Sequence, residues 1–92
     1  MTKQYKPAFE NQFKKHYKQM LKQPKYNKNQ FNEIYYLLIN DEEIPAKFND
    51  HNLINRKPER ELHIKPDWLL IYRYDGDYIK FIDTGSHSDL FE

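Results

Sequence analysis

The feature that most constrains the fold of this chain is the repeat of its apolar residues, which is helical in the first half and alternating in the second. Between residues 8 and 23 apolar side chains recur every three or four positions, with lysines mostly on the other side: Phe9, Phe13, Tyr17, Met20 and Leu21, against Lys14, Lys15, Lys18 and Lys22. The pattern predicts an amphipathic helix that ends at Pro24, because proline cannot continue the hydrogen-bond ladder of a helix.

A second helix is predicted from Phe31 to about Asn40. Asn27 and Gln30 precede its apolar residues at the spacing of a capping box, in which each side chain accepts a hydrogen bond from the other residue's backbone. Since only a short link around Pro24 joins the two helices, we expect them to form an antiparallel hairpin.

The second half of the chain predicts strands. Residues 41–58 are rich in Asn, Asp and Pro and predict mostly loop, with a short turn or strand near Phe48. Residues 59–64 alternate, so that Leu62 and Ile64 face one way while Glu61 and His63 face the other. The apolar run 68–72 is typical of a strand near the centre of a sheet. The pair Asp75-Gly76 then predicts a tight hairpin turn into a returning strand over 78–82.

These elements indicate an α+β fold in which two N-terminal helices pack on one face of a small antiparallel-rich sheet and leave the other face accessible. A length of 92 residues suits one domain over residues 1–92. The chain has no cysteine, which excludes disulfides and thiolate metal sites. It also has no apolar stretch of the roughly 20 residues that a membrane helix needs, and no secretion signal. We therefore expect a soluble, cytoplasmic protein that does not contact the membrane.

The charges are unevenly distributed, although the net charge is only +1. The first 30 residues hold eight lysines and one acid, whereas the remainder holds seven basic residues and thirteen acids. Two interpretations remain open. The basic helix either tracks the phosphates of a nucleic acid or is simply a solvated helix face.

Three histidines in the second half are candidates for proton transfer. His51, His63 and His87 each lie beside or near an acid, and histidine gains and loses its proton near neutral pH. If Leu62 and Ile64 face the core, His63 projects from the uncovered face of the sheet. The alternative is that each histidine is a surface or structural residue, which is how we interpret His16 on the first helix.

Other kinds of catalytic site fit less well. His63 and Asp67 have the spacing of helical metal ligands, but Pro66 lies between them, so neither a metal nor a cofactor is expected. Ser86 and Ser88 flank His87 without the pattern of an activated serine.

Cleavage of RNA remains, because there the substrate supplies its own nucleophile, the 2′-hydroxyl. The protein then needs an acid, a base and groups that stabilise the charged phosphate. Trp68 and Phe91 are candidates to stack on bases, with burial in the core as the alternative for Trp68.

Three blocks of the last 43 residues, in their order and spacing, resemble the YafQ-type toxins of the RelE superfamily: Asp50–Leu53, Arg60–Tyr72 and Thr84–Phe91. The resemblance implies a compact RelE-like toxin fold and a ribosome-dependent endoribonuclease that cuts messenger RNA in the decoding site. It also implies a cognate antitoxin that inhibits the toxin. Operator DNA would be bound only through that antitoxin.

The resemblance also implies roles for individual residues. His51, His63, Asp67 and His87 match the family's group for acid-base chemistry and phosphate contact, whereas the substrate-contacting positions are matched by Arg60, Trp68 and Phe91. Within this group His87 is expected to exchange a proton with a reacting oxygen. His63 with Asp67 is expected to form the complementary pair, and His51 to orient or protonate the phosphate. These roles can be permuted, because coupled groups resist individual assignment.

One position departs from the family. Asp83 stands where such toxins usually have an arginine, which places an acid where a guanidinium would meet the phosphate. Losing one such donor typically costs about 10²- to 10³-fold in rate. Two hypotheses follow. Either Arg60, Arg73 or Lys80 substitutes, with Lys80 and Asp83 on opposite faces if the strand is regular, or the chain is a weakened toxin that acts mainly as an antitoxin-binding, autoregulatory partner.

Overall fold

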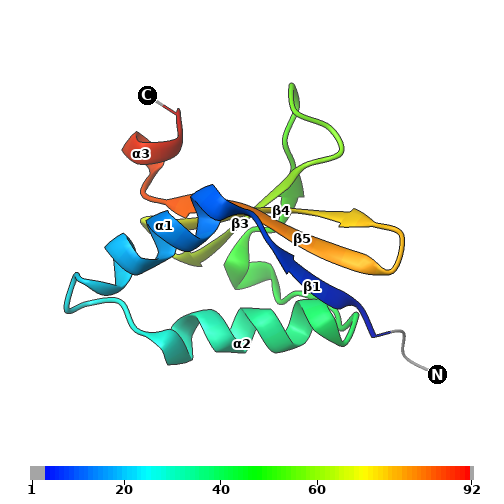
Figure 1. Cartoon of the computed structure of the whole chain (residues 1–92), viewed down its shortest axis with the longest axis horizontal. Coiled ribbons are helices and arrows are strands. Elements are labelled where there is room, and N and C mark those ends of the chain that lie inside the picture. The colour runs from blue at the N-terminus through cyan, green and yellow to red at the C-terminus, as the bar shows by residue number, and fades with distance from the viewer. Residues whose placement is uncertain (1–3, 92) are drawn as a thin grey trace.

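The computed structural model describes residues 4–91 and shows helices packed against a five-stranded mixed sheet (Figure 1). The strands lie in the order β1-β5-β4-β3-β2. In chain order the elements are β1 (Lys6–Phe9), α1 (Asn11–Leu21), α2 (Lys28–Ile39), the 3-10 turn η1 (Ala46–Phe48), β2 (His51–Asn52), β3 (Arg60–Lys65), β4 (Trp68–Asp75), β5 (Tyr78–Gly85) and α3 (His87–Phe91). The predicted α+β class is confirmed.

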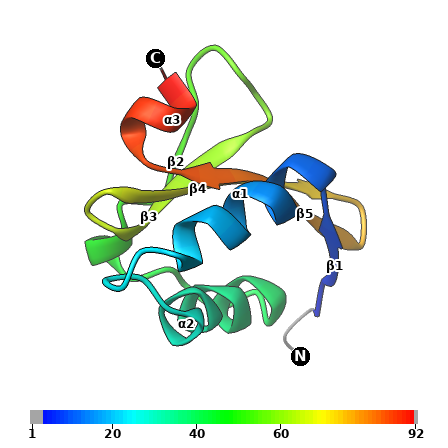
Figure 2. The same cartoon turned by 60° about the vertical axis from the view of Figure 1, so that its left-hand side comes forward.

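The core lies between one face of the sheet and the helices α1 and α2. Alternate residues of β3, β4 and β5 point into it, as the period of a strand requires, and α2 adds one apolar stripe. The core residues of these elements are Leu62, Ile64, Trp68, Leu70, Tyr72, Ile79 and Phe81 from the sheet, and Phe31, Ile34 and Leu38 from α2. Figure 2 shows α2 below the sheet with α1 between them.

Local signals set the ends of α2 and of the central hairpin, as predicted. Asn27 and Gln30 form the expected capping box, with hydrogen bonds of 3.0 and 3.1 Å, and the helix ends at Asn40. Gly76 adopts a positive φ of 60°, which glycine tolerates because it has no Cβ. It lies in the two-residue turn that joins Asp75 to its cross-strand partner Tyr78.

The beginning of the chain differs from the prediction. Residues 6–9 form the edge strand β1, which pairs in parallel with β5, and α1 starts only at Asn11. Pro7 is tolerated there because an edge strand leaves one row of amides unpaired. Beyond β1 the edge of β5 is covered by α1, since the Gln12 amide donates to the Ile82 carbonyl at 3.0 Å. A strand of four residues that pairs with residues 72 positions further along the chain leaves no periodic signal.

The end of the chain was also predicted incompletely. β5 extends to Gly85 instead of ending near 82, and His87–Phe91 form a short helix, α3, that was not predicted. Ser86 and Asp89 form a second capping box, in which Ser86 N donates to Asp89 Oδ2 at 3.0 Å and Asp89 N donates to Ser86 Oγ at 3.1 Å. This helix sets the position of His87.

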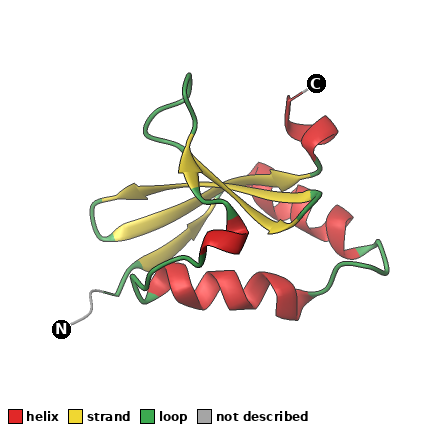
Figure 3. Cartoon of the chain, turned by 180° about the vertical axis from the view of Figure 1, so that it is seen from behind, coloured by secondary structure: helices red, strands yellow, loops and turns green. Residues whose placement is uncertain are grey.

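The sheet face turned away from α2 carries α3 and the loop between β2 and β3 (Figures 2 and 3). The predicted alternation of β3 is confirmed, because Leu62 and Ile64 are buried in the core while Glu61 and His63 lie on this other face. We call it the open face. None of the helices within residues 4–91 is long and apolar enough to span a membrane.

Candidate functional site

Two histidines and a glutamate meet on the open face where β2 joins β3. His51 is the cross-strand partner of Glu61, and His63 lies two residues further along β3 on the same side. Their Nε2 atoms lie 3.6 and 3.5 Å from the same Glu61 oxygen, Oε1. Glu61 is only 6% exposed, so its charge is shielded from water and directed at the two rings. We call these three residues the histidine–glutamate cluster.

The ring of His51 is held from both sides. Its Nδ1 lies 2.7 Å from the backbone carbonyl oxygen of Asn49, an acceptor, so Nδ1 carries the proton and donates it. The other ring nitrogen, Nε2, faces Glu61. Asn49 adopts a left-handed conformation with φ of 49°, which turns its carbonyl toward the ring.

A second group of residues is built by the β3–β4 turn and α3. The backbone amide of His87 donates to Asp67 Oδ1 at 3.3 Å, and the rings of His87 and Phe91 lie one helical turn apart with centroids at 5.2 Å. The capping hydrogen bonds from the backbone and side chain of Ser86 lower the pKa of Asp89. The carboxylate cap therefore holds the helix that carries His87 and Phe91.

The two groups border one hollow. A pocket of about 300 Å³ lies between the segment 51–56 and Phe91, so the end of α3 stands opposite His51. Three of the four predicted acid-base residues, His51, Asp67 and His87, are exposed, and His63 is half-buried. The structure thus brings residues from β2, β3, the β3–β4 turn and α3 to the open face.

The predicted pairing of His63 with Asp67 is wrong. The carboxylate within ion-pair distance of His63 is Glu61, whereas Asp67 binds the backbone of His87. The sequence had placed Glu61 on the face of His63 by alternation, but nothing local showed that His51 would lie across from it. Glu61 is the site residue that sequence reasoning missed.

Arg60 is engaged within the protein. Its guanidinium binds Asp50 through two nitrogens, at 3.0 and 3.3 Å, and donates to Asn52 at 2.8 Å. The Tyr72 hydroxyl donates to the same Asp50 carboxylate at 2.5 Å. The hydrogen bond to Asp50 raises the pKa of Arg60, and burial followed by the hydrogen bond to Asp50 raises the pKa of Tyr72. This Asp50–Arg60–Tyr72 network braces β2 against β3 and β4.

Trp68 is buried in the core, which was the alternative to its predicted stacking role. Its side chain is 0% exposed, and its indole N–H donates to the Thr84 hydroxyl at 2.9 Å. Thr84 in turn donates to the carbonyl of Leu69 at 2.6 Å. A ring packed on both faces in the core has no face left for a base. Phe91, by contrast, is 39% exposed and free to stack.

Asp83 is paired with His16 of α1. Asp83 Oδ1 lies 2.6 Å from His16 Nδ1 and also accepts the Thr84 amide at 2.8 Å. The pairing register passes from Tyr72↔Phe81 to Ile71↔Asp83, so a bulge at Ile82 interrupts the strand. His16 is therefore structural, one of the roles predicted for it.

The bulge also changes the relation between Asp83 and Lys80. A regular strand would have set them on opposite faces, but the extra residue brings both to the open face. Lys80 lies 3.0 Å from Asp75 and lowers the pKa of that carboxyl, and Arg73 lies 3.6 Å from the same carboxylate. Both cations thus have an acidic partner at the far end of the β4–β5 hairpin.

Among the described residues, no group of three His, Cys, Asp or Glu side chains could hold a metal ion. The open face carries imidazoles and carboxylates, which can exchange protons with a bound ligand.

Comparison with known proteins agrees with this fold. The profile of a family described as a bacterial toxin of type II toxin-antitoxin systems, YafQ, matches residues 5–92. The mRNA interferase toxin YafQ of Escherichia coli strain B / BL21-DE3 is 36% identical over 90% of this chain and 91% of its own length. Its counterpart in strain K12 is 42% identical over 60% of this chain and 62% of its own length. The crystal structure of the E. coli DinJ-YafQ complex matches with a TM-score of 0.85 and 33% identity, over 97% of this chain and 100% of that chain.

The fold and the family match define a small bacterial toxin of the RelE-like class. Within that class, the chain belongs to the YafQ family of type II toxins. The resemblance seen in the three sequence blocks is confirmed, and it extends to almost the whole chain.

Proposed function

We propose that this protein is an mRNA interferase that cuts messenger RNA on the ribosome by acid-base chemistry, with the RNA 2′-hydroxyl as nucleophile. The observation that carries the proposal is the convergence of the histidine–glutamate cluster with Asp67, His87 and Phe91 on the open face. The relatives named mRNA interferase toxin support it.

The reaction needs two proton transfers. A base removes the proton of the 2′-hydroxyl, and the oxygen attacks the adjacent phosphorus. The bond from phosphorus to the 5′-oxygen of the next nucleotide then breaks, which leaves a 2′,3′-cyclic phosphate. An acid protonates the departing 5′-oxygen. Imidazoles perform both transfers near neutral pH without a metal.

We assign His87 to exchange a proton with one of the reacting oxygens, and the histidine–glutamate cluster to serve the other oxygen and the phosphate. His87 is exposed on α3, next to the stacking ring of Phe91. His51 and His63 share the Glu61 carboxylate, which turns both rings to the same side. Asp67 acts through the backbone of His87 and is a positioning residue.

Arg60 supports this group from beside it. Because its guanidinium is bound to Asp50, its contribution is to hold β2, and hence His51, in register with β3. The Arg60 side chain is only 25% exposed, so only this exposed part of it is available to contact a phosphate.

We propose a cognate antitoxin as the partner that inhibits the toxin, with operator DNA bound only through that antitoxin. The solved DinJ-YafQ complex is of a toxin with this fold and supports such a partner. Co-expression with a candidate antitoxin, chosen from small open reading frames that neighbour the gene, followed by co-purification, tests it. An equimolar complex that abolishes cutting is expected.

The decisive experiment is cleavage of messenger RNA on programmed ribosomes, with product ends mapped by primer extension. His87→Ala and Glu61→Gln are each expected to lower the rate by about 10²- to 10⁴-fold. Tyr36→Phe, at an exposed residue of α2 outside the site, is the control and retains cutting. A folded His87→Ala variant that cuts as fast as the wild type would exclude our assignment of His87.

A catalytically weakened toxin is the second candidate, and Asp83 favours it. Its carboxylate lies on the open face, where negative charge repels an anionic substrate. If the loss of an arginine there is the cause, Asp83→Arg gains about 10²-fold or more in cutting over a weak wild type. An unchanged rate in Asp83→Arg would count against this second candidate.

A further inference from the structure

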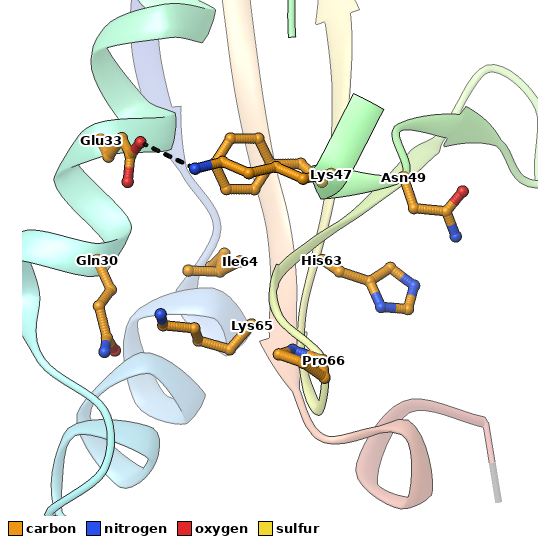
Figure 4. Close-up of a pocket in the computed structure, with 9 residues that line it drawn as sticks. Gln30, Glu33, Lys47, Asn49, His63, Ile64, Lys65 and Pro66 are labelled. Carbon is orange, nitrogen blue, oxygen red and sulfur yellow. Dashed lines mark ion pairs between the residues drawn. The ribbon is translucent and has the colours of Figure 1, made fainter. Parts of the chain in front are cut away.

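A second pocket begins at the outer side of the histidine–glutamate cluster. It has a volume of about 390 Å³, within the range of small-molecule sites, and lies between α2 on one side and η1 with β3 on the other (Figure 4). His63 borders both the cluster and this pocket. A ligand bound in this pocket would therefore lie next to any substrate group that His63 contacts.

The lining of this pocket combines an apolar floor with cations. Ile64 and Phe48 are buried beneath it and Pro66 forms one wall. Lys65 extends along the floor toward α2, as Figure 4 shows, and no acid lies within ion-pair distance of its ammonium among residues 4–91. Lys47 spans the upper end, 3.9 Å from Glu33. A flat apolar surface with nearby ammonium groups suits a base and the phosphate attached to it.

Asn49 links this pocket to the cluster. Its backbone carbonyl accepts from His51, and the residue lines the pocket. Its side-chain amide is turned away from α2, on the side where the His63 ring lies (Figure 4), and makes no hydrogen bond with any described residue. An exposed amide offers one donor group and one acceptor, the pair of functions that reads the edge of a base. Gln30, the other amide of the lining, is instead occupied by the cap of α2.

We propose that this pocket binds the nucleotide of the message next to the bond that is cut, with Asn49 contacting its base and Lys65 its phosphate. The inference rests on the proposed function, because it takes RNA as the substrate. It makes Asn49 a specificity-determining residue. The cut position then depends on the flanking base as well as on access to the scissile link.

The test measures cutting of four programmed messages that differ only in the base flanking the cut, on either side in turn. The wild type is expected to prefer one base over the poorest by about tenfold or more. Asn49→Gly keeps the left-handed backbone and the carbonyl for His51 but removes the amide, so this preference should fall to about one. Asn49→Asp, which only accepts hydrogen bonds, should change the preferred base.

Lysine variants separate phosphate contact from base contact. Lys65→Ala is expected to raise KM severalfold for all four messages and to leave the base preference unchanged. Lys15→Ala, an exposed lysine of α1 outside the pocket, is the charge-matched control. A base preference that survives in folded Asn49→Gly, or a wild type without any preference at the flanking positions, would overturn the inference while leaving the proposed function intact.

A wild type that cuts no message refutes the proposed function instead, and the pocket is then tested directly. Nucleoside 5′-monophosphates are titrated into the protein and followed by NMR. Shifts at the Asn49 side-chain amide and at Lys65 that are lost in Asn49→Gly support a nucleotide site. Their absence at millimolar concentration overturns it.

Discussion

The side chains at and near the site are of two kinds. Some are exposed to solvent, and others are buried in the core beneath them. Trp68 and Phe91 show the contrast, since both are aromatic and both were predicted from the sequence to contact substrate. One is fully buried and hydrogen-bonded to Thr84, and the other is 39% exposed beside His87. Their variants should therefore fail in different ways.

Trp68→Phe is expected to lower the free energy of unfolding by about 1–3 kcal/mol, because it removes a buried hydrogen bond and leaves space in the core. The folded fraction should still cut RNA. Phe91→Ala should do the reverse, with little change in urea unfolding and a clear loss of cutting. A Trp68→Phe variant of wild-type stability that cannot cut would restore the substrate role for Trp68.

Asp83 differs from these two residues because its partner, His16, lies on another element, α1. The 2.6 Å contact with His16 is partly buried, so a double-mutant cycle should give a coupling energy on the order of 1 kcal/mol. His16→Ala, Asp83→Asn and the double variant form the cycle, measured by urea unfolding. Asparagine keeps an oxygen for the Thr84 amide. Additive effects of the two changes would show that the pair does not stabilise the fold.

Among the elements, α3 depends most on local capping. It buries no residue of its own, and its position is set by the Ser86–Asp89 capping box and by the bond from His87 to Asp67. The lowered pKa of Asp89 means that its stabilising effect is present above the unfolded value of about 3.9 and is lost as pH falls through the folded value. The helix should therefore fray in acid before the sheet unfolds.

Ser86→Ala is expected to destabilise α3 locally by about 0.5–2 kcal/mol without lowering the Tm of the whole protein. Amide exchange at residues 87–91 should become faster, and cutting should fall because His87 and Phe91 lose their positions. Ser88→Ala removes a hydroxyl of the same helix outside the capping box and is the control. Unchanged amide protection in Ser86→Ala would refute the role given to the cap.

Across the whole molecule, the Asp50–Arg60–Tyr72 network couples the site to the core. Tyr72 is fully buried, yet its hydroxyl reaches the carboxylate that also holds Arg60 beside His51. The pKa of Tyr72 is higher in the folded protein than in the unfolded chain. The Tyr72 hydroxyl therefore contributes its full stabilising free energy below the unfolded pKa of about 10, and this contribution is lost as the pH rises toward the folded pKa.

Tyr72→Phe is expected to cost about 1–3 kcal/mol at neutral pH, since Asp50 loses a hydrogen-bond donor. Above about pH 10 the gap between the wild type and this variant should narrow, by up to about 1.4 kcal/mol per pH unit. Unfolding by urea at a series of pH values measures the gap. Tyr36→Phe, at a side chain that is 59% exposed, is the control. A gap that stays constant with pH would exclude Tyr72 as the titrating group.

The sequence by itself determined the parts of this protein that depend on neighbours along the chain. The cap of α2, the turn at Gly76 and the alternation that put Glu61 and His63 on one face each follow from backbone geometry over a few residues. Only the tertiary structure decided which distant segments meet. It paired β1 with β5, buried Trp68, joined Asp83 to His16 and set His51 across from Glu61. The physical reason is that a local repeat specifies which side of an element is apolar, whereas its partner is chosen by the packing of the whole core.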